Sequence, residues 1–158
     1  PCPGGHFCKE GSTYPTICPG GFYCALNSSV ARSCPPGTFC LVGSWAPILC
    51  PRGTYCVGQS VIAALCPLGT YGNESATLNR YSIGSACVNC PRGYFGNDPD
   101  RLKCEICFAG YLCFGNTTMH VFGTTRGDPQ DISIDGGQIC PAGFYCPSGS
   151  FESTPCPR

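Results

Sequence analysis

Apolar residues along this chain follow the period of a repeated phrase and not the period of a helix. Each copy reads Cys-Pro-x-Gly-x-aromatic-Cys, so apolar and turn-forming residues alternate over only seven positions. Polar stretches such as Gly11-Ser12, Asn27-Ser28 and Gly43-Ser44 separate the copies and are typical of turns. The pattern therefore predicts short strands and loops with little or no helix.

The phrase recurs every 16 residues in the first part of the chain, beginning at Cys2, Cys18, Cys34, Cys50 and Cys66. Looser copies begin at Cys90, Cys107 and Cys140, and Cys156 lies 16 residues after Cys140. A short fixed period of this kind indicates a tandem array in which each unit contacts mainly its neighbours.

The conformational preferences of each residue type explain why it occurs in the phrase. Proline fixes φ, and the glycine suits a turn that needs a positive φ. The aromatic residue is expected to pack on a disulfide, because units this small hold no other core. These aromatic residues are Phe7, Tyr23, Phe39, Tyr55 and Tyr71.

Spacing divides the chain into four segments. Residues 1–72 form the regular repeats, and residues 73–113 follow a looser pattern that starts after Gly72, where a cysteine is expected. Residues 114–139 are an insertion that we expect to form a hairpin or surface loop with a specific contact. Residues 140–158 resume the repeat and stop within a further copy, so we expect a piece of a longer protein.

Seventeen cysteines among 158 residues predict a small disulfide-rich fold, here an elongated tandem array of short β/loop cysteine repeats. Dense disulfides persist in oxidising surroundings, so we expect an extracellular protein. Structural zinc is disfavoured because the chain has only His6 and His120 and few paired Cys-x-x-Cys sites. No cofactor is expected beyond covalent glycans.

Equivalent cysteines of a repeat are expected to pair alike, which leaves two schemes. One joins Cys8 to Cys18 and Cys24 to Cys34; it leaves Cys2 single and closes two-residue loops of a strained kind. We favour consecutive pairing, with the partner of Cys156 outside this segment. The consecutive pairs are Cys2–Cys8, Cys18–Cys24, Cys34–Cys40, Cys50–Cys56, Cys66–Cys87, Cys90–Cys104, Cys107–Cys113 and Cys140–Cys146.

The run CPLGTYG, CVNCPRGYFG and CEICFAGYLC within residues 66–113 resembles the ephrin-receptor-like cysteine repeat. That family is similar in turn to the first half-module of tumour-necrosis-factor-receptor repeats. The regular copies look most like large protist surface glycoproteins, including those of ciliary hairs (mastigonemes). The resemblance implies an extracellular array that is secreted or lies on a cell or ciliary surface.

The balance of charged residues limits the classes of partner that this chain can bind. Nine basic residues balance nine acidic ones, which disfavours nucleic acid and anionic membranes as partners. The most apolar stretch, residues 61–65, is far shorter than the roughly 20 residues that span a bilayer.

Neither histidine lies in a catalytic motif, so we expect no enzyme. Asp128, Asp131 and Asp135 lack the spacing of a calcium loop and are interpreted as solvated turn residues, with calcium binding left open.

Only 11% of the residues are charged, so we expect glycans to solvate the chain at its three Asn-x-Ser/Thr sequons, Asn27, Asn73 and Asn116. The surplus aromatic residues either pack locally or form an exposed stripe for self-association or sugar stacking. They are Phe22, Trp45, Tyr94, Phe95, Tyr111 and Phe144.

The favoured hypothesis is a structural segment of an extracellular, glycosylated filament or surface coat. Its partners are further copies of itself or neighbouring filament or coat proteins, through the array and the insertion. The alternative is the stalk or ligand-binding ectodomain of a receptor or adhesion protein.

Overall fold

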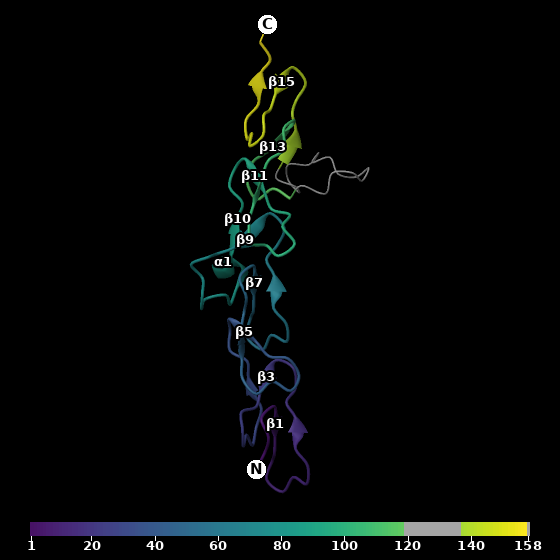
Figure 1. Cartoon of the computed structure of the whole chain (residues 1–158), viewed down its shortest axis with the longest axis vertical. Coiled ribbons are helices and arrows are strands. Elements are labelled where there is room, and N and C mark those ends of the chain that lie inside the picture. The colour runs from purple at the N-terminus through teal and green to yellow at the C-terminus, as the bar shows by residue number, and fades with distance from the viewer. Residues whose placement is uncertain (119–136, 158) are drawn as a thin grey trace. The chain divides into compact units, whose positions relative to one another are not determined.

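The computed structural model describes residues 1–118 and 137–157. Contacts divide the chain into two compact units, and both are built from two-stranded antiparallel hairpins (Figure 1). The first unit comprises Pro1–Leu65 and Asn73–Ala86, and the second comprises Cys66–Gly72 and Cys87–Arg158.

Every copy of the phrase forms one hairpin. The first strand follows the glycine of the phrase, and the second strand ends just before the first cysteine of the next copy. We number the repeats 1 to 8 by their first cysteines, which are Cys2, Cys18, Cys34, Cys50, Cys66, Cys90, Cys107 and Cys140. The predicted disulfide-rich β/loop array with almost no helix is therefore confirmed.

Repeats 1 to 4 lie in the first unit, with one short helix, α1 (Ile83–Ala86). The pairs are β1 (His6–Phe7) with β2 (Thr16–Ile17), β3 (Phe22–Tyr23) with β4 (Arg32–Ser33), β5 (Thr38–Phe39) with β6 (Ile48–Leu49), and β7 (Thr54–Tyr55) with β8 (Ala64–Leu65).

Repeats 5 to 8 lie in the second unit. The pairs are β9 (Thr70–Gly72) with β10 (Cys87–Asn89), β11 (Tyr94–Phe95) with β12 (Glu105–Ile106), β13 (Tyr111–Cys113) with β14 (Gly137–Ile139), and β15 (Phe144–Tyr145) with β16 (Thr154–Pro155). The last three residues of the 114–139 insertion thus form the second strand of repeat 7, and its remaining residues lie in the sequence between the two strands.

A tight turn starts each hairpin. In repeat 1 the carbonyl of Pro3 accepts the N–H of His6 at 3.2 Å, with Gly5 between them at φ 80°. Repeat 2 copies this geometry with Pro19, Gly21 and Phe22. A positive φ at the third turn residue is the type II geometry, which explains why the phrase needs glycine there. We call this residue the turn glycine.

Cystines occupy the interior of the array. Cys18, Cys24, Cys40 and Cys56 are fully buried, whereas the aromatic residues of the phrase in repeats 1 to 5 are only partly buried. Buried apolar residues other than cysteine are few in the described part of the chain, namely Ala76, Ala86, Phe95 and Leu112. With so little apolar burial, closure of the unfolded chain by each short disulfide, about 2–3 kcal/mol, is a major stabilising contribution.

The disulfides follow the consecutive order, and Cys156 is free and exposed. Six of the eight bonds join cysteines six residues apart within one phrase. The remaining two are Cys66–Cys87 and Cys90–Cys104.

Repeats 5 and 6 move the second cysteine to the opposite strand of the hairpin. Gly72 takes the place of the second cysteine of repeat 5, and Cys87 is its direct partner across the strands. Gly96 takes the same place in repeat 6, where a Cβ atom would lie 2.9 Å from Cys90 Sγ. Glycine therefore leaves the space that the relocated disulfide needs.

Two turn glycines provide a matched test of packing between repeats. A Cβ on Gly21 would lie 2.5 Å from the carbonyl oxygen of Gln59, whereas a Cβ on Gly143 meets no described atom within 4 Å. Both residues have a φ near 80°, so Gly→Ala costs each of them about 1–2 kcal/mol of backbone strain.

We expect Gly21→Ala to destabilise the array beyond this shared strain, because the Gln59 carbonyl must move away. Amide hydrogen exchange around residue 59 should accelerate about tenfold or more relative to Gly143→Ala. Equal protection at these amides in the two variants would show that close contact between repeats contributes nothing.

Candidate functional site

Within each unit, backbone hydrogen bonds join one repeat to the next, and these junctions are the first candidate site. From repeat 1, Gly5 N–H donates to the Cys24 carbonyl at 2.8 Å, and Cys8 N–H donates to the Ser28 carbonyl at 2.9 Å. In return, Asn27 N–H donates to the Cys2 carbonyl and Cys18 N–H donates to the Gly5 carbonyl, both at 2.8 Å. Four bonds thus satisfy backbone groups that one hairpin alone leaves unpaired.

The same four bonds recur between repeats 2 and 3 and between repeats 3 and 4, at 2.8–3.0 Å. Net stabilisation from one such bond is about 0.5–1.5 kcal/mol, but an unpaired buried group costs more, so each repeat depends on its neighbour. The bonds at these two junctions are Gly21–Cys40, Cys24–Ser44, Gly43–Cys18, Cys34–Gly21, Gly37–Cys56, Cys40–Ser60, Gln59–Cys34 and Cys50–Gly37.

A left-handed residue stands tenth in six of the eight repeats and shapes the junction. It has a φ between 53° and 80°. From the third repeat on, its carbonyl lies against the turn glycine two repeats earlier, as Gly43 lies against Gly5 and Gly149 against Gly93. The repeats therefore contact their second neighbours as well as their first. The left-handed residues are Gly11, Asn27, Gly43, Gln59, Asn116 and Gly149.

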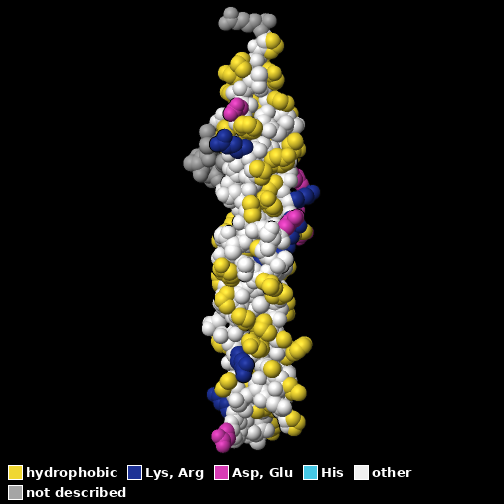
Figure 2. Space-filling model, turned by 90° about the vertical axis from the view of Figure 1, so that its left-hand side faces the viewer, with side chains coloured by type: hydrophobic (Ala, Val, Ile, Leu, Met, Phe, Trp, Pro, Cys, Tyr) yellow, Lys and Arg dark blue, Asp and Glu magenta, His cyan; other side chains and the backbone are white. Residues whose placement is uncertain are grey.

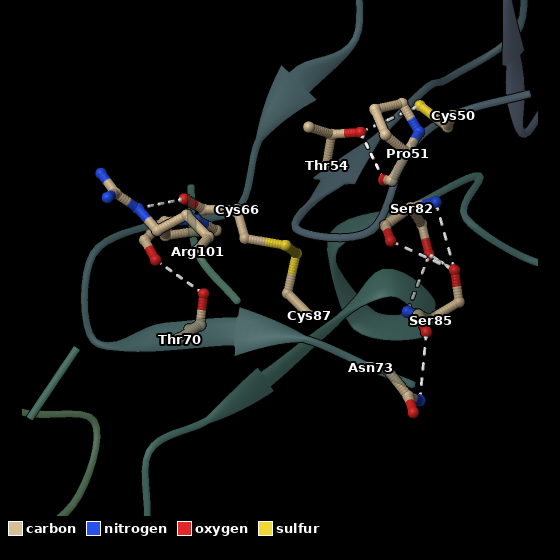
Figure 3. Close-up of a disulfide and its surroundings, with 11 residues drawn as sticks. Cys50, Pro51, Thr54, Cys66, Thr70, Asn73, Ser82, Ser85, Cys87 and Arg101 are labelled. Atoms are coloured by element: carbon tan, nitrogen blue, oxygen red, sulfur yellow. Dashed lines mark hydrogen bonds between the residues drawn. A yellow bond between two sulfur atoms is a disulfide. The ribbon is translucent and has the colours of Figure 1, made fainter. Parts of the chain in front are cut away.

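Two arginines replace this tenth residue where the regular period is broken. The carbonyl of Cys50 accepts a bond from Arg80 Nη1 at 3.0 Å. The carbonyl of Cys66 accepts one from Arg101 Nε at 3.1 Å, as Figure 3 shows. The carbonyls of these arginines accept the N–H groups of Cys56 and Gly72 in turn. A guanidinium thus supplies the donor that a loop amide supplies elsewhere.

The three sequons lie in different local structures. Asn27 and Asn116 both occupy the left-handed position and are exposed. Asn27 Oδ1 accepts the N–H of Cys2 at 3.1 Å, and among the described residues its Nδ2 has no acceptor. Asn73 is partly buried, with Oδ1 bound by the N–H of Ser75 and Nδ2 3.5 Å from the carbonyl of Ser85.

Exposed apolar side chains form the second candidate site. Figure 2 shows apolar groups over much of the surface and few charged ones. Trp45 is 70% exposed, Tyr94 and Phe144 are also exposed, and Phe22 and Tyr111 are partly buried. Phe95 is buried, with its ring centroid 5.2 Å from that of Phe108. The surplus aromatic residues are therefore divided between local packing and the surface.

The calcium hypothesis concerns Asp128, Asp131 and Asp135, which lie outside the described residues. Within residues 1–118 and 137–157, no three His, Cys, Asp or Glu side chains are grouped to hold a metal ion. No described helix is long and apolar enough to cross a membrane.

The chain fits no family model, and no curated protein is significantly similar to it.

Sequence reasoning located the cysteines, the turn glycines and the sequons but missed Arg80, Arg101 and the left-handed position. The arginines lie 30 and 35 residues from the cysteines that they bind, outside any repeat period. The left-handed position had a visible signal, because Gly or Asn stands ten residues into most regular copies.

Replacement of Arg80 tests whether its guanidinium replaces a backbone donor. We expect Arg80→Met to lower stability by about 1–3 kcal/mol, because the Cys50 carbonyl loses its donor. The thermal midpoint of the disulfide-intact protein and amide exchange near Cys56 measure the effect. Lys103→Met is the control, since Lys103 forms a surface ion pair with Glu105 at 3.7 Å, a kind worth about 0–1 kcal/mol. Equal losses in both variants would contradict the assigned role.

Proposed function

We propose that this chain is a structural segment of an extracellular, glycosylated filament or surface coat that assembles from many copies. The observation that carries the proposal is the recurring junction, in which neighbouring repeats of one unit complete each other's backbone hydrogen bonds. An array of this kind transmits force along its backbone and disulfides without a large apolar core.

Redox chemistry supports the location. Eight disulfides in a chain of 158 residues fit an extracellular or secreted protein, because such bonds are reduced in the cytosol. The resemblance to ephrin-receptor-like repeats agrees with this location and belongs to the same proposal.

Surface composition supports assembly. Many large apolar side chains are exposed in both units, including Trp45 and Ile62 in the first and Ile106 and Tyr145 in the second. Soluble monomers rarely expose large contiguous apolar patches, and such patches mark interaction surfaces. A formal net charge of zero gives copies little reason to repel one another.

Glycans at Asn27, Asn73 and Asn116 complete the proposal, since they solvate a chain with few charges. Asn27 is well placed, because its Oδ1 is bound to the backbone while its Nδ2 is available for a sugar. The junction bonds of Asn27 and Asn116 are made by backbone N–H groups, so sugars on the side chains leave those bonds intact.

Electron microscopy of native material tests the function. We expect ordered filaments or sheets that contain many copies, with sugars at the sequons in mass spectra of glycopeptides. Enzymatic deglycosylation should make the material less soluble, because uncharged apolar surface is then uncovered. A monodisperse monomer in light scattering, with native glycans intact, would reject the filament and favour the receptor stalk.

A further inference from the structure

The single tryptophan of the chain stands on the surface of the first unit, in the loop between β5 and β6. Residues 41–48 of this loop line a hollow of about 460 Å³. Trp45 and three other exposed apolar residues, Leu41, Val42 and Ile48, belong to that lining. We call these four residues the Trp45 patch.

The backbone holds this loop in one conformation. Gly43 has a φ of 78° and donates its N–H to the Cys18 carbonyl at 2.8 Å, while the Ser44 carbonyl accepts the N–H of Cys24 at 2.9 Å. Gly4 lies against Trp45, since a Cβ on Gly4 would be 3.3 Å from the tryptophan Cβ. An apolar surface held this firmly loses little conformational entropy when it binds a partner.

The chemistry of the patch selects the kind of partner. Residues 33–51 contain no charged residue, and Ser44 is the one polar side chain that lines the hollow. A charged partner would lose its hydration there without gaining an ion pair. A sugar would find one hydroxyl where sugar hydroxyls need several polar groups. The lining therefore favours an apolar protein surface.

We propose that the Trp45 patch binds the same patch of a second copy, an inference that rests on the proposed self-assembly. Trp45 lines the hollow and is still 70% exposed, so the loop is self-complementary: a two-fold axis places the indole of each copy against the apolar lining of the other. Two uncharged patches bring no like charges together, and tryptophan is enriched among the residues that dominate binding energy.

The fluorescence of Trp45 reports directly on this contact. The oxidised, glycosylated protein is followed over a concentration series by sedimentation equilibrium, and acrylamide quenching of tryptophan fluorescence is measured on the same samples. We expect the quenching constant to fall and the emission to shift to the blue as the mass rises, because the indole leaves water.

Two matched variants locate the contact. Leu41 and Val57 both directly follow the second cysteine of their phrase and are similarly exposed, but only Leu41 lines the hollow. Leu41→Asp should weaken association about tenfold or more, because it buries an unpaired charge, while Val57→Asp leaves association unchanged. Both variants retain Trp45, so the fluorescence measurement serves for each.

The outcomes separate this inference from the proposed function. Association with unchanged tryptophan quenching, or equal weakening by both variants, would overturn the patch and leave self-assembly intact. Protection of Trp45 by added oligosaccharides without a rise in mass would assign the patch to sugars and overturn the inference. A monomer at every concentration would overturn both the patch contact and assembly of this segment.

Discussion

The first cysteine of a repeat donates its backbone N–H to the carbonyl of the turn glycine in the repeat before it. This hydrogen bond recurs within both units. A two-residue strand pair leaves most of its N–H and C=O groups unpaired, and this chain has little apolar interior to compensate. Each hairpin is therefore stable only within the array. Disulfides hold the turn of every repeat in shape, and the next repeat pairs its remaining backbone groups.

The dependence of each hairpin on its neighbour explains which positions of the phrase vary between repeats. The turn glycine is required because its φ is positive and, in repeats 1, 2, 5 and 6, because a Cβ atom would lie 2.4–2.5 Å from a carbonyl oxygen. The second cysteine is replaceable, since repeats 5 and 6 place glycine there and take the sulfur from the opposite strand. Loop length is also replaceable, provided that a donor reaches the carbonyl of the first cysteine. Arg80 and Arg101 supply that donor where the loop amide does not.

Local features of the fold were predictable and long-range ones were not. Turn chemistry and cysteine spacing within one phrase predicted the hairpins, because these interactions span only a few residues. The partner of a junction amide is a backbone carbonyl in a neighbouring repeat. Every residue has such a carbonyl, so the residue types in the sequence do not indicate which one is the partner. Trp45 was singled out as surplus, but the phrase does not reveal that it lies against Gly4, two repeats earlier.

Disulfide mapping tests the account most directly, because the junctions of repeats 1 to 4 are made by phrases that are each closed by their own cystine. Trypsin cleaves after Lys9 and Arg32 and releases residues 10–32, which contain Cys18 and Cys24. Under non-reducing conditions and after deglycosylation, we predict this peptide alone, with one internal disulfide. A mass that includes residues 1–9 or residues 33–52, joined through Cys8 or Cys34, would contradict the account.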